Sequence, residues 1–125
     1  MGTHDVDAWT VERHLEAGSE HGRALFHRFV EIVADCGEYS TSVAKTTITF
    51  KGPRRGFAGA RPKGDRLQGY FDVTYCVDDP RVSRASPYQK DLFVHHFRVD
   101  SLEQMDDEFV RWIADAYEQV GCGNR

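Results

Sequence analysis

Two adjacent histidines, His95 and His96, are the residues of this 125-residue chain best suited to acid–base chemistry. An imidazole titrates near neutral pH and can serve as a general base, a hydrogen-bond donor to a ligand or a metal ligand. Both lie in an apolar run, residues 92–99, which predicts a strand. Because side chains alternate along a strand, His95 is expected to face an aromatic layer and His96 the opposite side, with Arg98. Both are candidate catalytic residues, and a hydrogen-bonded core histidine is the simpler alternative.

A glycine- and arginine-rich run, residues 52–64, provides a second kind of chemistry. Glycine lets the backbone approach a ligand closely, and the planar arginine fork suits oxyanions. Ahead of this run, Lys45, Thr47 and Thr49 share one face of a predicted strand. If that face is also the one that carries His96 and Arg98, these side chains would line one polar groove. The candidate ligand-binding residues are therefore Lys45, Thr47, Arg54, Arg55, Arg61, Lys63, His96 and Arg98.

The formal net charge of −4 hides an uneven distribution along the chain. Residues 1–44 carry a net −5, residues 45–98 a net +6, and residues 99–125 a net −5. A basic middle segment favours an anionic partner, such as a phosphate, a carboxylate or a nucleic-acid backbone. Two plainer interpretations stay open: solvated hairpin turns, or a basic surface that neutralises the acidic helices of the same molecule.

Known catalytic motifs are absent or incomplete. Gly59 and Gly64 have the glycine spacing of a P-loop, but Asp65 and Arg66 replace the lysine and hydroxyl residue that such a loop needs. No acidic residue stands two positions before any lysine, which argues against a metal-nuclease core. We therefore expect no metal ion and no cofactor, and whether the chain is an enzyme stays open.

The helices are expected in three places. Thr10 is a suitable N-cap for a short helix through Leu15, and a 3.6-residue apolar period predicts a longer helix over residues 20–36. Ser101 and Gln104 have capping-box spacing, which predicts a long C-terminal helix through residue 120.

Four strands are predicted between these helices, over residues 43–50, 56–61, 67–74 and 92–99, with a polar loop at 78–90 that contains two prolines. This order predicts an α+β fold: an antiparallel sheet of about four strands backed by two N-terminal helices and one long C-terminal helix. We expect a single domain over residues 1–125, with flexible ends at 1–8 and 121–125.

The compartment is predicted to be the cytoplasm. No segment approaches the ~20 consecutive apolar residues of a membrane span, and the N-terminus lacks the pattern of a signal peptide. Three widely spaced cysteines, Cys36, Cys76 and Cys122, indicate reduced thiols. We expect no membrane partner. A homodimer through a sheet edge or the aromatic C-terminal helix is allowed on general grounds.

Four blocks of sequence carry a family resemblance: residues 9–15, 43–50, 56–63 and 93–99. Together they resemble the bacterial and archaeal family catalogued as domain of unknown function 5655, which is similar in layout to small YdhG-like α+β proteins. The resemblance implies the fold but no established reaction. The positions that it singles out are Lys45, Phe57, Pro62, Lys63, His95 and His96.

Three functional hypotheses follow. The first is a binding module that accepts a small anionic ligand or a phosphate-bearing partner on a basic strand and turn surface. The second is a nucleic-acid accessory domain, which the negative net charge and the lack of a recognition helix disfavour. The third is a small enzyme that uses His95 or His96 as acid or base, with Lys45 or Arg98 holding an oxyanion.

Overall fold

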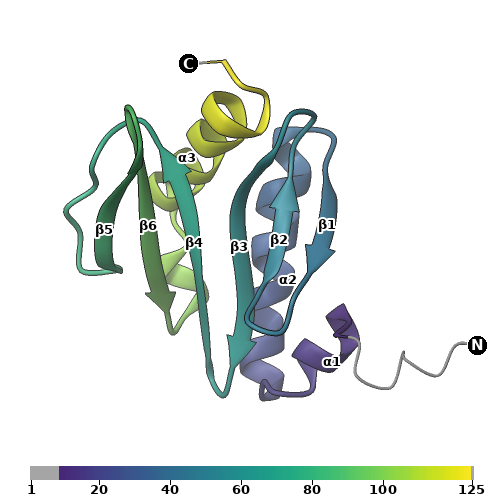
Figure 1. The fold of residues 1–125 in the computed structure, drawn as a ribbon. Helices are drawn as coiled ribbons and strands as arrows, with labels where there is room; N and C mark the ends of the chain where they lie inside the picture. The colour runs from purple at the N-terminus through teal and green to yellow at the C-terminus, as the bar shows by residue number, and fades with distance from the viewer. Residues whose placement is uncertain (1–8, 125) are drawn as a thin grey trace, which may run out of the picture.

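The computed structural model describes residues 9–124, and in them one antiparallel sheet carries helices on a single face (Figure 1). The strands are β1 (Ser40–Val43), β2 (Ile48–Lys51), β3 (Gly56–Lys63), β4 (Arg66–Val73), β5 (Val82–Gln89) and β6 (Leu92–Val99). Their spatial order is β1-β2-β3-β4-β6-β5. The helices are α1 (Val11–Leu15), α2 (Glu20–Cys36), η2 (Leu102–Gln104), α3 (Asp107–Ala116) and η3 (Tyr117–Gly121). The predicted α+β class with an antiparallel sheet is confirmed.

The N-terminal helices begin where their capping residues predict. Thr10 Oγ1 accepts a hydrogen bond of 3.0 Å from the Arg13 N–H, which fixes the first turn of α1. Ser19 Oγ accepts one of 3.1 Å from the Gly22 N–H at the start of α2. The apolar stripe of α2 packs onto the sheet.

The predicted strand count of about four is wrong, because the sheet has six strands. One reason lies in residues 43–50, which contain the end of β1, a turn and most of β2 rather than a single strand. The chain turns between them, where the Ala44 N–H donates to the Thr47 carbonyl at 2.9 Å. A run of threonines without glycine or proline conceals this turn in the sequence.

The second reason is β5, which occupies most of the segment predicted as a polar loop. This strand lies at the edge of the sheet and pairs only with β6. Its side chains are largely exposed, two irregularities interrupt its register, and Pro87 is accommodated there. Edge strands tolerate proline and charge because one side needs no partner, so apolar alternation is lost.

The C-terminal helix is shorter than predicted at its start. Gln104 Oε1 accepts from the Ser101 N–H at 3.1 Å, as the capping-box spacing suggests, but this contact belongs to the 3₁₀ turn η2. The helix α3 begins afterwards, with Asp106 Oδ1 accepting from the Phe109 N–H at 3.0 Å. It continues into the single π-helical turn η3.

The predicted flexible ends fall in two different situations. Residues 1–8 lie outside the described residues. At the other end, the Gly121 carbonyl accepts from the Arg54 N–H at 2.8 Å, and the Asn124 N–H donates to the Glu118 carbonyl at 3.1 Å. The last residue of η3 is thus hydrogen-bonded to the β2–β3 turn, and the backbone after η3 is hydrogen-bonded to η3 itself.

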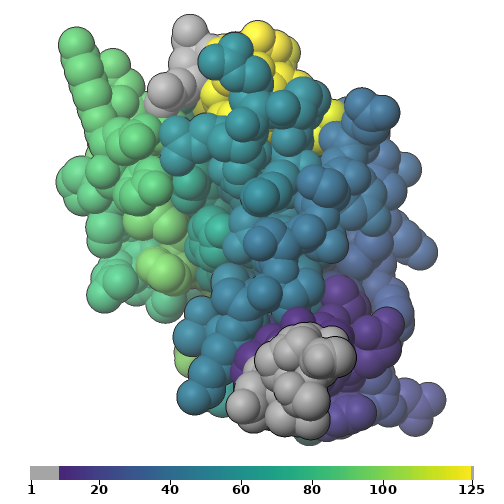
Figure 2. Space-filling view, turned by 45° about the vertical axis from the view of Figure 1, so that its right-hand side comes forward, coloured from purple at the N-terminus to yellow at the C-terminus, as the bar shows by residue number. Residues whose placement is uncertain are grey.

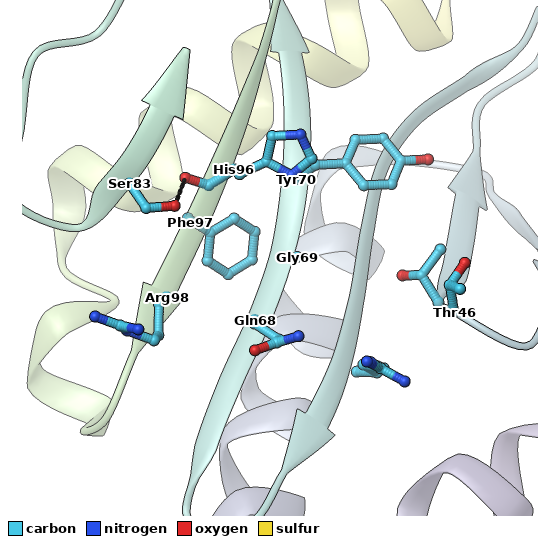
Figure 3. Close-up of a pocket in the computed structure, with 10 residues that line it drawn as sticks. Thr46, Gln68, Gly69, Tyr70, Ser83, His96, Phe97 and Arg98 are labelled. Carbon is cyan, nitrogen blue, oxygen red and sulfur yellow. Dashed lines mark hydrogen bonds between the residues drawn. The ribbon is translucent and has the colours of Figure 1, made fainter.

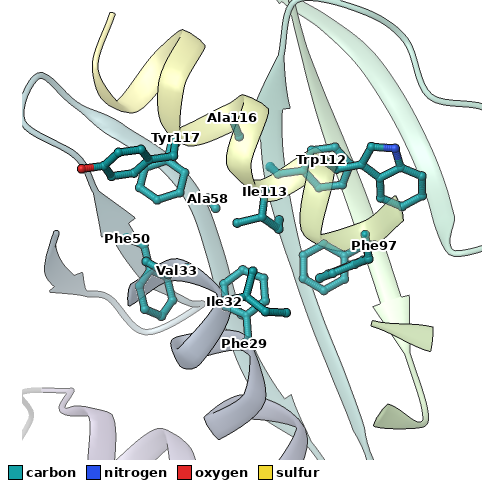
Figure 4. Close-up of a cluster of buried hydrophobic side chains, with 14 of the residues drawn as sticks. Phe29, Ile32, Val33, Phe50, Ala58, Phe97, Trp112, Ile113, Ala116 and Tyr117 are labelled. Carbon is teal, nitrogen blue, oxygen red and sulfur yellow. The ribbon is translucent and has the colours of Figure 1, made fainter. Parts of the chain in front are cut away.

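One aromatic core joins the helices to the sheet (Figure 4). Phe29 of α2 stacks on Phe97 of β6 with ring centroids 5.7 Å apart, and Trp112 of α3 stacks on Phe71 of β4 at 5.6 Å. Both helices lie behind the sheet in Figure 1, so in the described residues they cover only this face. The opposite face of the central strands is left to polar residues.

Candidate functional site

The open face of the sheet is built by strict alternation along β4. Leu67 and Phe71 are buried under the helices. Gln68, Tyr70 and Asp72 point to the other side because neighbouring side chains of a strand face opposite ways. The sequence alternation of residues 67–74 predicts this division.

Strand pairing then brings one row of residues across this face. Thr49 pairs with Gly59, Gly59 with Tyr70, and Tyr70 with His96. The Tyr70 ring extends over Gly59, and its hydroxyl lies 3.2 Å from Thr49 Oγ1 within hydrogen-bond distance. Figure 3 shows the Tyr70 and His96 side chains close together across the front of the sheet. Glycine is needed at position 59 because a side chain there would meet the Tyr70 ring.

Replacing Gly59 with alanine is therefore expected to move the Tyr70 ring and break its contact with Thr49. The added Cβ would overlap the ring and lie 3.1 Å from the Ile48 carbonyl oxygen, which we expect to cost about 1–2 kcal/mol of stability. Thermal unfolding and the NMR shifts of the Tyr70 ring check this result. Tyr70→Phe is the control, because it removes the hydroxyl without a steric change. Unchanged ring shifts in Gly59→Ala would contradict the proposed contact.

The first of two hollows on this face, the Arg61–Arg98 pocket, has a volume of about 440 Å³. Its lining residues are Thr46, Thr47, Arg61, Gln68, Gly69, Tyr70, Ser83, His96, Phe97 and Arg98. Arg61, Gln68 and Arg98 are paired across three neighbouring strands. Figure 3 shows Arg98 on the β6 side, Gln68 on β4 and Thr46 toward β2.

Two features of the Arg61–Arg98 pocket leave polar groups without partners. Among residues 9–124, neither guanidinium forms a hydrogen bond or an ion pair. Thr47 Oγ1 is buried and has no hydrogen-bond partner within the same residues. In the space-filling view the teal central strands are recessed between the green β5–β6 residues and the blue β1–β2 residues (Figure 2). The pocket therefore offers unused donors in a hollow.

The second hollow, the Asp72 pocket, has a volume of about 460 Å³ and adjoins the first. Its lining residues are Thr49, Lys51, Arg55, Gly56, Tyr70, Asp72, Tyr88, Val94 and His96. Asp72 is only 5% exposed, and its Oδ1 has no hydrogen-bond partner in the described chain. Burial raises the pKa of the Asp72 carboxyl to about 6, an effect that the positive charge of Arg55 partly opposes.

The two adjacent histidines have different environments. His95 is fully buried and stacks on Phe71 with ring centroids 4.8 Å apart. Its Nε2 accepts from the Val77 N–H at 2.9 Å, so its Nδ1 carries the proton and donates to the Phe93 carbonyl at 3.1 Å. Burial lowers its pKa. Both ring nitrogens are thus used by the backbone of the core.

His96 lines both pockets on the open face, where an imidazole can meet a ligand. Burial lowers its pKa, and the nearby positive charge of Arg84 lowers it further. A neutral imidazole at pH 7 can donate or accept one hydrogen bond at each nitrogen. Of the two candidate catalytic residues, only His96 is available to a ligand.

The structure separates the other predicted ligand-binding residues. Thr47, Arg61, His96 and Arg98 line the Arg61–Arg98 pocket, and Arg55 lines the Asp72 pocket with His96. Lys63 lines a third hollow at the β3–β4 turn, together with His21 and Arg66. Lys45 and Arg54 are exposed on turns and line neither of the two pockets on the open face.

Sequence reasoning did not single out Gln68, Tyr70 and Asp72, although the alternation of β4 placed them on one face. The missing signal was strand order, which puts β4 between the two arginine-bearing strands. A buried carboxylate also has no distinctive local sequence pattern.

Two further findings concern other kinds of site. Within residues 9–124, no group of three or more His, Cys, Asp or Glu side chains is arranged to hold a metal ion. No helix in that part of the chain has the length and hydropathy of a membrane span.

Comparison with known proteins places the chain in a family. Searches of curated proteins and of solved structures each found no match. The family model described as "Domain of unknown function (DUF5655)" matches residues 11–120, which include all six strands and most of the helical residues. This match confirms the resemblance carried by the sequence blocks, and the chain belongs to the DUF5655 family.

Proposed function

We propose that the protein is a binding module whose Arg61–Arg98 pocket accepts the phosphate or carboxylate group of a small ligand. One observation carries this proposal: two arginines that have no ion-pair partner among residues 9–124 flank Gln68 over the same hollow. Arginine forks form strong charge-assisted hydrogen bonds to oxyanions. The net +6 of residues 45–98 adds a favourable potential around them.

The uncharged groups of the pocket support the same ligand chemistry. Thr47 has a buried hydroxyl without a hydrogen-bond partner in the described residues, and Gln68 adds an amide between the two guanidinium groups. Hydroxyl and amide N–H groups donate to phosphate oxygens without adding charge. An anion in this pocket would therefore lie among polar groups as well as charges.

Removing either arginine is expected to weaken phosphate binding. Arg61→Ala and Arg98→Ala should each raise the dissociation constant of inorganic phosphate by about tenfold, since a hydrogen bond to a charged group contributes roughly 1.5–3 kcal/mol. Isothermal titration calorimetry or NMR shift titration measures this change. Arg54→Ala is the matched control, because it removes the same charge from a turn outside the two pockets.

The same titrations separate this proposal from its rivals. Equal weakening by all three arginine variants would show a diffuse charge effect and overturn the assigned pocket. Tighter binding of short RNA or DNA with a steep salt dependence would favour the nucleic-acid hypothesis. The enzyme hypothesis depends on His96, because the ring nitrogens of His95 are already bonded.

A further inference from the structure

We propose that the Asp72 pocket is the second half of the same ligand site and binds the hydrogen-bond-donating edge of a purine nucleotide with an imino and an amino group, as in guanosine monophosphate. This inference rests on the proposed function, because the phosphate of that ligand would occupy the Arg61–Arg98 pocket. Four observations support it in turn: the unused carboxylate, the adjacency of the two pockets, the distance that a ligand would span, and the character of the walls.

The unused carboxylate is the first observation. Asp72 is only 5% exposed and lines the hollow, and no group in residues 9–124 donates a hydrogen bond to its Oδ1. The nearest cationic candidate, Arg55, instead donates to Gln89 at 3.3 Å and lies over the Tyr88 ring at 5.9 Å. Burying a carboxylate without hydrogen-bond donors costs free energy of folding. No hydrogen bond to Oδ1 within residues 9–124 compensates for this cost, so the structure gives Asp72 no stabilising role. Donors from a ligand would satisfy it.

The second observation is that the two pockets are adjacent. Tyr70 and His96 line both of them, and these residues pair directly across β4 and β6. In the described residues, the side chains of this shared pair lie between the arginine side and the carboxylate side. A ligand that lies over Tyr70 and His96 would therefore contact both pockets.

The separation of the two pockets defines the length of that ligand. Gln68 and Asp72 are four residues apart on the same strand, which corresponds to about 13 Å at about 3.3 Å per residue. The long arginine side chains shorten the span that a ligand has to bridge. The ligand must carry its anion and its donor group at opposite ends, as a nucleoside monophosphate does.

The walls of the Asp72 pocket favour a flat ring. Tyr70 and Tyr88 contribute aromatic side chains and Val94 an apolar one, and Tyr88 is 54% exposed. Aromatic side chains pack well against nucleobases, and a carboxylate reads the donor groups of a base edge. Guanine has an imino and an amino group side by side on one edge, and both can donate toward a carboxylate. Adenine has only an amino donor on that edge.

The test compares ligands that differ in one end only. Isothermal titration calorimetry of the full chain at pH 7.5 would use guanosine 5′-monophosphate, inosine 5′-monophosphate and ribose 5-phosphate. We expect the guanine nucleotide to bind at least about tenfold more tightly than ribose 5-phosphate. The inosine nucleotide lacks the amino group, so its affinity should lie between those of the other two ligands. This comparison needs no altered protein.

Two variants locate the effect. Asp72→Asn should reduce the advantage of guanosine 5′-monophosphate over ribose 5-phosphate to less than about threefold, while the affinity for ribose 5-phosphate stays unchanged. Asp35→Asn is the control, because that exposed carboxylate lies on α2, on the covered side of the sheet.

The outcomes distinguish this inference from the proposed function. If ribose 5-phosphate binds through Arg61 and Arg98 but the guanine nucleotide binds no better, the Asp72 inference is overturned and the anion pocket stands. An advantage that persists in Asp72→Asn also overturns the inference. Absence of binding by every phosphorylated ligand overturns both.

Discussion

Replacing Arg81 with alanine should destabilise the protein by about 3 kcal/mol. The Arg81 side chain is 11% exposed and joins two distant parts of the chain. Its guanidinium binds both oxygens of Asp79 at 2.8 and 3.0 Å, Asp106 at 2.8 Å and Glu108 at 2.7 Å. It also lies 4.6 Å from the centre of the Trp112 ring. Alanine would leave three carboxylates without their cation and would remove a side chain that packs against α3.

Urea unfolding followed by tryptophan fluorescence measures this loss. Arg28→Ala is the matched control, because Arg28 and Glu31 form an exposed pair on α2 at 3.3 Å, and exposed pairs contribute at most about 1 kcal/mol. Arg81→Lys should recover little, since an ammonium group cannot reproduce the planar fork. A loss in Arg81→Ala no larger than that of Arg28→Ala would show that the cluster is not structural.

The Arg81 cluster also shows why part of this fold could not be predicted. Its partners Asp106 and Glu108 are 25 and 27 residues away in sequence. No local pattern connects them, and their placement depends on β5 lying beside β6. From the sequence alone, the acidic residues at the start of α3 indicate only a favourable interaction with the helix dipole.

Local sequence patterns predicted two kinds of element: helices that begin at a capping residue, and helices or strands that bury only one face. The cap of α1 by Thr10 and the stripe of α2 are confirmed. β4 kept its predicted alternation because one of its faces is buried under the helices. β5 was missed because an edge strand needs no apolar face, and η2 was missed because its capping contact closes a single turn.

The sequence predicts on which face of a strand each site residue lies, but it does not predict which strands are neighbours. Alternation placed His96 and Arg98 together on one side of β6, and the structure agrees. Whether Arg61 and Thr47 share that side depended on which strands are neighbours. The order β1-β2-β3-β4-β6-β5 answers this by placing β4 in the middle of the basic residues. Lys45 fell on a turn instead, because the first predicted strand is divided in two.

Asp72→Asn is expected to stabilise the free protein at pH 7.5 by about 2 kcal/mol. The carboxyl has an ordinary pKa of 3.8 and a pKa of about 6 in the folded protein, mainly because of burial. The folded state therefore holds the proton more tightly than the unfolded state. Stability conferred by the protonated carboxyl is present in acid and is lost as the pH rises from about 4 to about 6. Above pH 6 both states are ionised and no further change comes from this group.

The magnitude follows from the size of the pKa shift. One pKa unit corresponds to about 1.4 kcal/mol, so a rise from 3.8 to about 6 corresponds to at most about 3 kcal/mol. The expected figure is smaller because the asparagine amide is itself a buried polar group that needs partners. Urea unfolding of both proteins at pH 4 and pH 7.5 isolates the effect, since every other titrating group is common to the two.

The free energy of unfolding of Asp72→Asn should thus be equal to or lower than that of the unaltered protein at pH 4, and higher at pH 7.5. Equal stability at both pH values would mean that Asp72 finds donors in the folded protein, and the carboxylate would no longer be an unused group. Asp79 shows the opposite behaviour, because its hydrogen bonds from Arg81 lower its pKa. A carboxylate that is expected to reduce the stability of the free protein at neutral pH, in a hollow that adjoins the Arg61–Arg98 pocket, fits a residue retained for binding rather than for folding.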